Sequence, residues 1–288
     1  MALKNMSMNI PENVYKLIDL SLQEDIGKGD ITTEAILPRA KTANARFIAK
    51  ENGIIAGLEI AFNIFTKLDS GIEFESSFKD GEKVKKEELI ATVSGQARSI
   101  LIAERTVLNF MQRMSGVATT TRKYVDSISH TSCKVLDTRK TIPGHRFLDK
   151  YAVKIGGGTN HRARLDSMFL IKENHIAAAG GISQAIEACN LYANQNGVDA
   201  EIEIEVKNFS EIKQVLHHGR VKYILLDNMS IKNLKEAVTL INNRFLTEAS
   251  GNVSLDTIGL IAETGVDFVS VGALTHSVKA FDISLIFD

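Results

Sequence analysis

The chain has 288 residues, a length that fits two domains or one large α/β barrel with an additional module. Its 44% hydrophobic and 24% charged residues are ordinary for a globular protein, and its formal net charge of −1 excludes an overall basic field that would attract nucleic acid or a membrane surface. Any binding of anions must therefore depend on local clusters of Lys and Arg.

The cysteines and the first residues bear on the cellular compartment. Cys133 and Cys189 are the only cysteines, so the sequence indicates neither a disulfide framework nor a cysteine zinc site. Residues 1–16 lack the apolar core of a signal peptide, and no run of about 18 apolar residues occurs in the chain. We therefore expect a cytoplasmic enzyme without a membrane segment.

The first third of the chain mixes helices and strands. A helix is predicted from the cap at Asn9 and Pro11 to Gly27, and a second helix over 58–68. Alternating apolar residues predict strands within 43–49, 72–75 and 89–93. A long helix follows from Leu101, with a break at Gly116. We place the domain boundary there, which gives domains of 1–115 and 116–274, with the tail 275–288 packing on the first domain.

The remainder alternates strands with helices. Short apolar runs occur at 134–136, 168–171, 202–206, 223–226, 244–247 and 268–271. Four helical patterns are each preceded by a serine: Ser183, Ser210, Ser230 and Ser254. Strands that alternate with helices indicate a parallel sheet, and six such units without a G-x-G-x-x-G motif favour a closed or nearly closed barrel over a doubly wound sheet.

Polar or ionisable residues follow every one of these strands. In α/β barrels the active site lies at the carboxyl ends of the strands, so the strand ends should converge on one mouth. The early ends are cationic: Arg139, Lys140, His161, Arg162, Arg164 and Lys172. So many cations would repel one another without an anionic ligand, so we expect a polyanionic substrate. Arg164 fits an ordinary surface charge equally well.

The middle strand ends are acidic. Glu205 and Asp227 follow consecutive strands, and their carboxylates suit ribose hydroxyls or a Mg²⁺ ion that a phosphorylated substrate carries. Both could instead be salt-bridge partners of Arg139 or Lys172. Glu201 and Glu203 are interpreted as the outward or register partners of the same strand.

Small or polar residues follow the last two predicted strands. They consist of Ser250, Gly251 and Asn252, and of Ser270, Val271 and Gly272. Loops after the final barrel strands commonly bind phosphate, aided by the N–H groups at helix N-termini. The mouth thus offers a phosphate seat, a hydroxyl or metal seat and a cationic wall, as a phosphoribosyl donor beside an acidic acceptor would need.

Several motifs, in order and spacing, resemble those of quinolinate phosphoribosyltransferases. They are Asp137-Thr-Arg-Lys-Thr141, Gly156-Gly-Gly-Thr-Asn-His-Arg162, Phe169-Leu-Ile-Lys-Glu-Asn-His175, Ile202-Glu-Ile-Glu-Val206 and Leu225-Leu-Asp-Asn228, and residues 24–30 and 104–109 resemble the N-terminal motifs of the family. The resemblance implies an N-terminal α/β sandwich domain packed on a C-terminal incomplete, six-stranded TIM-like barrel. It also implies a homodimer with a shared active site, which Arg105 of the partner enters; assembly beyond the dimer is left open.

The resemblance further implies the roles of the site residues. Arg139, His161, Arg162 and Lys172, beside Thr138, would hold the carboxylates of quinolinate, and Lys140 would face the pyrophosphate of phosphoribosyl pyrophosphate (PRPP). Glu205 and Asp227 would contact ribose hydroxyls and the Mg²⁺ shell, and loops 250–252 and 270–272 the 5′-phosphate. The product would be nicotinate mononucleotide. Asn252 departs from the family, in which a glycine is expected, but asparagine tolerates the left-handed conformation.

Three alternatives remain at this point. A barrel aldolase would use Lys140 or Lys172 as a Schiff base, which requires a lysine of depressed pKa. Residues 78–93 resemble the hairpin of biotinyl or lipoyl carrier domains, although the modifiable tip motif is missing. A related phosphoribosyltransferase acting on another pyridine acid is the nearest functional rival.

Overall fold

The computed structural model describes residues 9–288, so residues 1–8 of the segment inspected for a signal peptide lie outside it. The chain divides into two compact units. Unit 1 contains residues up to 122, 141–157 and 277–288, and unit 2 contains 123–140 and 158–276. This division differs from the predicted boundary at 115/116, because residues 116–122 and 141–157 belong to unit 1.

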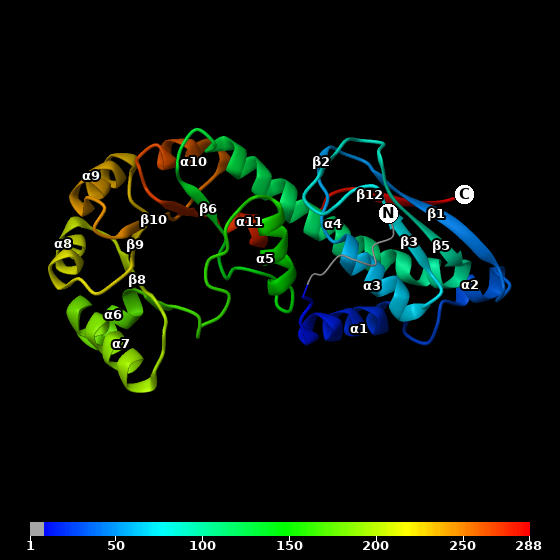
Figure 1. Cartoon of the computed structure of the whole chain (residues 1–288), viewed down its shortest axis with the longest axis horizontal. Helices are drawn as coiled ribbons and strands as arrows, with labels where there is room; N and C mark the ends of the chain where they lie inside the picture. Colours follow the sequence, from blue (N-terminus) through cyan, green and yellow to red (C-terminus); the bar gives the residue numbers. More distant parts are fainter. Residues whose placement is uncertain (1–8) are drawn as a thin grey trace. The chain divides into compact units, whose positions relative to one another are not determined.

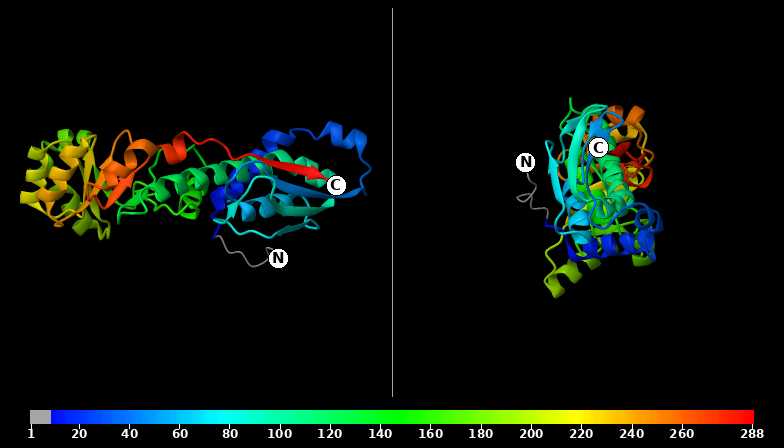
Figure 2. Two further views of the ribbon diagram at one scale, coloured as in Figure 1. Left: turned by 90° about the horizontal axis from the view of Figure 1, so that it is seen from above. Right: turned by 90° about the vertical axis from the view of Figure 1, so that its right-hand side faces the viewer.

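Unit 1 is built on an antiparallel sheet with the strand order β12-β1-β5-β3. Its strands are β1 (Thr42–Ala49), β3 (Glu73–Ser76), β5 (Leu89–Gln96) and β12 (Ile283–Phe287). Strand β12, red in Figures 1 and 2, comes from the end of the chain and pairs with β1. The short strands β2 (Gly53–Ile54) and β4 (Lys83–Val84) form a separate pair. Phe65 of α3 (Leu58–Leu68) contacts Phe47 of the sheet edge to face and Phe74 in a tilted arrangement, which fixes the helix on the sheet.

The other helices of unit 1 are α1 (Glu12–Ile26), α2 (Ile31–Ile36) and α5 (Arg146–Ile155). Helix α4 (Ala97–Ser127) starts earlier than predicted and has no break at Gly116. A Cβ atom on Gly116 would lie 2.4 Å from the carbonyl oxygen of Lys279, so this glycine permits a close backbone approach instead. No helix among residues 9–288 is both long and apolar enough to cross a membrane.

Unit 2 is a parallel sheet with the strand order β6-β11-β10-β9-β8-β7. The strands are β6 (Lys134–Leu136), β7 (Phe169–Ile171), β8 (Ile202–Val206), β9 (Tyr223–Asp227), β10 (Leu246–Ser250) and β11 (Phe268–Ser270). Within the described residues β6 and β7 do not pair, and Thr159 bridges Leu136 beside β6. The predicted incomplete six-stranded barrel is therefore confirmed.

Helices lie along the outside of this sheet (Figure 1). They are α6 (Glu173–Ala179), α7 (Ile182–Asn196), α8 (Phe209–His218), α9 (Ile231–Ile241) and α10 (Leu255–Ala262), and a short α11 (Ala273–His276) follows β11. Ser230 and Ser254 cap helices as predicted. The predicted caps Ser183 and Ser210 were wrong: α7 begins after Gly181, and the side chain of Asn208 caps α8.

Strand β10 extends three residues beyond its predicted end at Thr247. It pairs with β9 from Leu246 opposite Tyr223 to Ser250 opposite Asp227. Backbone pairing with the neighbouring strand continues through residues that the sequence suggested were a loop. As a consequence, Glu248 belongs to the strand and is buried in the barrel.

Candidate active site

A cavity of about 970 Å³ lies at the carboxyl ends of the six barrel strands. Thirteen of the residues proposed from the sequence line it: Thr138, Arg139, Lys140, His161, Arg162, Lys172, Glu205, Asp227, Ser250, Gly251, Asn252, Ser270 and Gly272. They follow different strands, and the parallel sheet brings them together because all its strands end on the same side. The predicted mouth is therefore present in the folded chain.

Arg139 and Arg162 form the cationic side of this cavity. Among the described residues, no acceptor bonds to the buried Nε and Nη1 of Arg139. Burial lowers the pKa of Arg162, the positive charge of Arg139 lowers it further, and the charge of Glu203 opposes both. Buried guanidinium donors without acceptors are costly, so this part of the cavity is suited to an anionic ligand that supplies oxygen atoms.

Lys172 and Glu205 face each other at the ends of neighbouring strands. Nζ of Lys172 lies 3.4 Å from Oε2 of Glu205, so the ion pair considered from the sequence is present. Asp227 lines the same cavity and accepts a hydrogen bond from the side chain of Asn228. The cavity thus has cations on one side and two carboxylates within reach of the same space.

The loops after β10 and β11 supply small residues. Gly251 has φ 104, and a Cβ atom there would lie 2.1 Å from Oδ1 of Asn228. Asn252 has φ 51, the left-handed conformation that the sequence interpretation expected an asparagine to tolerate. Helix α10 begins shortly after, with Ser254 and Thr257 in a capping box. This backbone geometry is suited to an anion at a helix N-terminus.

Three proposed residues are not among those that line this cavity. Val271 is 1% exposed and packs in the core, so only its backbone could take part in a phosphate loop. Arg105 is exposed on α4 and belongs to unit 1, and it does not line the cavity. Arg164 does not line it either and pairs on the surface with Asp166, as its surface interpretation expected.

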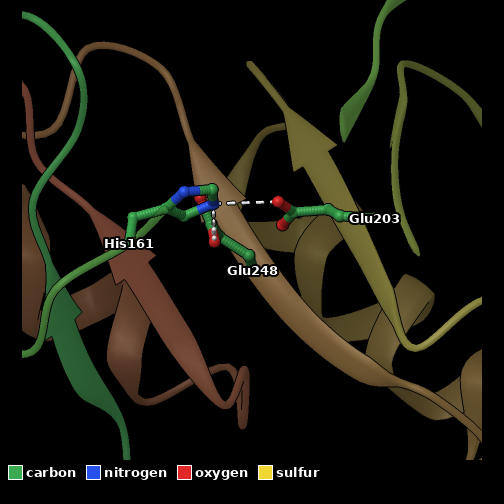
Figure 3. Close-up of side chains that lie close together, drawn as sticks. All are labelled: His161, Glu203 and Glu248. Atoms are coloured by element: carbon green, nitrogen blue, oxygen red, sulfur yellow. Dashed lines mark hydrogen bonds and ion pairs between the residues drawn. The ribbon is translucent and has the colours of Figure 1, made fainter. Parts of the chain in front are cut away.

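His161 belongs to a buried cluster whose two carboxylates were not predicted. Nε2 of His161 lies 2.8 Å from Oε2 of Glu203 and 3.5 Å from Oε2 of Glu248 (Figure 3). Of the two interpretations given for Glu203, the outward one was wrong, because its side chain is 1% exposed. Its position two residues before Glu205 was an available signal, since alternate residues of a strand share a face. Glu248 was missed because β10 was ended too early.

The two halves of the chain match two protein-family descriptions. Residues 30–115 match the N-terminal domain of quinolinate phosphoribosyl transferase, and residues 117–286 match its C-terminal domain. The chain belongs to the quinolinate phosphoribosyltransferase family. The two family matches meet at residues 115–117, whereas the compact units divide the chain differently, as described above.

Similar proteins cover nearly the whole chain. Quinolinate phosphoribosyltransferase (decarboxylating) 1b of Nicotiana tabacum is 48% identical over 94% of this chain and 81% of its own length. A probable nicotinate-nucleotide pyrophosphorylase (carboxylating) of Bacillus subtilis is 40% identical over 94% and 92%. The crystal structure of NadC from Streptococcus pyogenes matches with a TM-score of 0.92 at 37% identity, covering 98% of this chain and 100% of that one. The family relationship therefore extends to both domains of the chain.

Proposed function

We propose that this protein transfers the phosphoribosyl group of PRPP to quinolinate, with decarboxylation, and forms nicotinate mononucleotide, pyrophosphate and CO₂. The observation that carries the proposal is one cavity in which a cationic wall faces two carboxylates and two small loops. Family membership and the names of the relatives support the same reaction.

The cationic wall is the proposed seat of the acceptor acid. Arg139 has buried donors without acceptors, and Arg162 lies close enough to feel its charge. Two adjacent carboxylates of a pyridine acid would satisfy these donors, because a guanidinium presents paired N–H groups in the geometry of a carboxylate. Lys172 adds a point charge at the next strand end, and Thr138 a hydroxyl.

Glu205 and Asp227 are the proposed acceptors of ribose hydroxyl groups. PRPP would enter as its Mg²⁺ complex, and carboxylates at this place fit the water shell of that ion without being its direct ligands. Mg²⁺ bound to pyrophosphate would neutralise charge on the leaving group. Loops 250–252 and 270–272 would hold the 5′-phosphate through backbone N–H groups.

The proposed chemistry needs no nucleophilic side chain. The ring nitrogen of quinolinate attacks C1 of the ribose, and the bond to pyrophosphate breaks with its electron pair. Lys140, at the cavity edge beside Gly272, stabilises the negative charge that develops on pyrophosphate. The positively charged ring then accepts the electron pair of the breaking C–C bond as CO₂ leaves, and a proton replaces the carboxylate.

We propose a homodimer in which Arg105 of one copy completes the cavity of the other. Arg105 is exposed, and unit 1 also exposes large apolar side chains: Leu20 at 62%, Ile31 at 81% and Ile36 at 70%. Exposed apolar groups of this size commonly mark a protein interface. We also retain a cytoplasmic location as a proposal, to be tested by fractionation, because some plant relatives carry mitochondrial or chloroplastic names.

The alternatives receive less support. A Schiff-base aldolase needs a desolvated lysine, whereas Lys172 has a side chain that is 51% exposed and is paired with Glu205. The hairpin considered as a carrier is part of unit 1, where Asp80 accepts hydrogen bonds from the N–H groups of Gly57 and Leu58. A pyridine acid other than quinolinate remains the second candidate, since the same wall would hold one carboxylate.

The reaction can be tested directly. The protein is incubated with PRPP, Mg²⁺ and either quinolinate or nicotinate, and CO₂ and the mononucleotide are followed. We expect product with quinolinate, with CO₂ and mononucleotide formed in equal amounts. Product from nicotinate alone would favour the second candidate, and no pyrophosphate release with either acid would overturn the proposal.

A further inference from the structure

His161, Glu203 and Glu248 form a buried cluster of ionisable side chains at the cavity, which His161 and Glu248 also line. The side chains are 11%, 1% and 3% exposed, respectively. They come from the segment between β6 and β7, from β8 and from β10, and one ring nitrogen of His161, Nε2, faces both carboxylates (Figure 3). Burying two carboxylates is costly, so such a cluster calls for a specific explanation.

Both ring nitrogens of His161 are engaged within the protein. Nε2 is within hydrogen-bond distance of Glu203, and Nδ1 accepts a hydrogen bond of 2.8 Å from the backbone N–H of Arg162. The second contact needs a lone pair on Nδ1, so the ring hydrogen lies on Nε2 and is directed at the carboxylates. The carboxylates therefore orient the His161 ring through Nε2, and the ring in turn holds the backbone N–H of Arg162 through Nδ1.

The segment that carries Arg162 is fixed at three further points. Oδ1 of the buried Asp137 accepts the backbone N–H of His161 at 2.8 Å. The N–H of Thr159 donates to the carbonyl oxygen of Val135, and Nη1 of Arg162 donates to the carbonyl oxygen of Met168. These contacts replace the strand pairing that β6 and β7 lack, so the position of Arg162 depends on them.

The charges around Arg162 also connect it to Arg139 and Glu203. Arg139 and Arg162 repel each other, while the negative charge of Glu203 favours the charged form of Arg162. We propose that Glu203 and Glu248 are positioning residues, which hold His161 and, through its Nδ1, the backbone of Arg162, so that the two arginines remain together to receive the acceptor acid.

The test compares Glu203→Gln and Glu248→Gln with Glu201→Gln. Glutamine keeps the size of the side chain and removes its charge, and Glu201 is an exposed residue of the same segment paired with Lys222. The proposal rests on the proposed function for its kinetic readout. We expect KM for quinolinate to rise about tenfold in the two buried variants, as loss of a charged hydrogen-bond partner would cause, with KM for PRPP nearly unchanged. Glu201→Gln should resemble the wild type.

A second readout does not depend on activity. Hydrogen exchange of the Arg162 amide, measured in the full-length protein, should be faster in Glu203→Gln than in Glu201→Gln, because its acceptor His161 is less firmly held. Should Glu203→Gln fail to fold, Glu248→Gln answers the same question, since its contact with the ring is longer at 3.5 Å.

The outcomes separate the two proposals. Unchanged KM for quinolinate together with unchanged Arg162 exchange would overturn the positioning role. A similar rise in both KM values, accompanied by a fall in kcat and Tm, would also overturn it, because it would indicate a purely structural role. The three side chains also form a group that could hold a metal ion, so a stoichiometric metal that Glu203→Gln removes would overturn the hydrogen-bonded arrangement. A wild type inactive with quinolinate would reject the proposed function, while the exchange result would still decide the inference.

Discussion

Nζ of Lys172 lies 3.4 Å from Oε2 of Glu205, across the ends of two neighbouring strands. The lysine is proposed to meet the acceptor acid and the glutamate to meet the ribose, so the pair lies where the two substrates would adjoin. The lysine side chain is 51% exposed and the glutamate 13%, so the pair contributes little stability but places two opposite charges beside the reacting groups.

This pair leads to a first prediction. Lys172→Gln should raise KM for quinolinate about tenfold or more, because a charged contact to a carboxylate is lost. Glu205→Gln should mainly lower kcat. The double variant should lose less transition-state stabilisation, calculated from kcat/KM, than the two single variants together, since the two side chains interact. Steady-state kinetics measure these effects. Lys222→Gln is the matched control, because its exposed ion pair with Glu201 does not line the cavity.

The neighbouring residues Arg139 and Lys140 should behave differently. Arg139→Ala should mainly weaken quinolinate binding, because it removes a planar two-donor contact, whereas Lys140→Ala should lower kcat more than it weakens that binding. Arg164→Ala, a surface residue paired with Asp166, should match the wild type. Wild-type kinetics in both Arg139→Ala and Lys140→Ala would contradict the assignment.

The loop after β10 can be tested by substitution at two adjacent positions. Gly251→Ala should raise KM for PRPP and cost about 1–3 kcal/mol of stability, because φ is 104 and the new Cβ would meet Asn228 at 2.1 Å. Asn252→Gly should be tolerated, since φ 51 suits glycine. Kinetics with PRPP and thermal unfolding provide the readouts, and equal behaviour of the two variants would contradict the proposed phosphate seat.

The shared site predicts complementation between two inactive variants. A mixture of Arg105→Ala and Lys172→Ala subunits should regain activity, because one cavity in a mixed dimer would contain both wild-type residues. Each variant alone, at the same total protein concentration, serves as a control. Absence of recovery, although mass spectrometry demonstrates subunit exchange, would argue against Arg105 acting in a second copy.

The buried cluster should make stability depend on pH. Burial raises the pKa of Glu203 from 4.5 to about 7, and the charge of Glu248 adds to it although His161 opposes it. Burial lowers the pKa of His161, but the hydrogen bonds to Glu203 and Glu248 outweigh it and raise the value from 6.5 to about 9. Since Nδ1 accepts the Arg162 N–H, the additional proton is best placed on the carboxylates and shared by the cluster.

Both pKa values are raised in the folded state, so protonation of the cluster favours folding. Because the folded state keeps protons that the unfolded chain has lost, the contribution is full below about pH 4.5 and falls as pH rises through 7 to 9. Urea unfolding between pH 6 and 9 should show a steeper loss for the wild type than for Glu203→Gln, with Glu201→Gln like the wild type. Parallel curves for the wild type and Glu203→Gln would contradict this.

The sequence by itself determined the alternation of strands and helices, and with it the side of the barrel on which the site lies. Thirteen of the proposed residues line the cavity; those at the strand ends could be predicted because parallel strands must end together, whereas His161 and Arg162 lie in the long segment between β6 and β7. The family motifs added Arg105, whose place in a second copy stays a prediction.

Only the tertiary structure decided what lies beneath that mouth. Glu203 and Glu248 lie 42 and 87 residues from His161 along the chain and 45 residues from each other, and strand register alone directs both toward His161. A one-residue shift of register would turn each carboxylate to the opposite face of its strand, and sequence spacing cannot exclude such a shift. The cationic wall could therefore be predicted from the sequence, whereas the positions of the buried carboxylates proposed to hold it depend on the pairing of the strands.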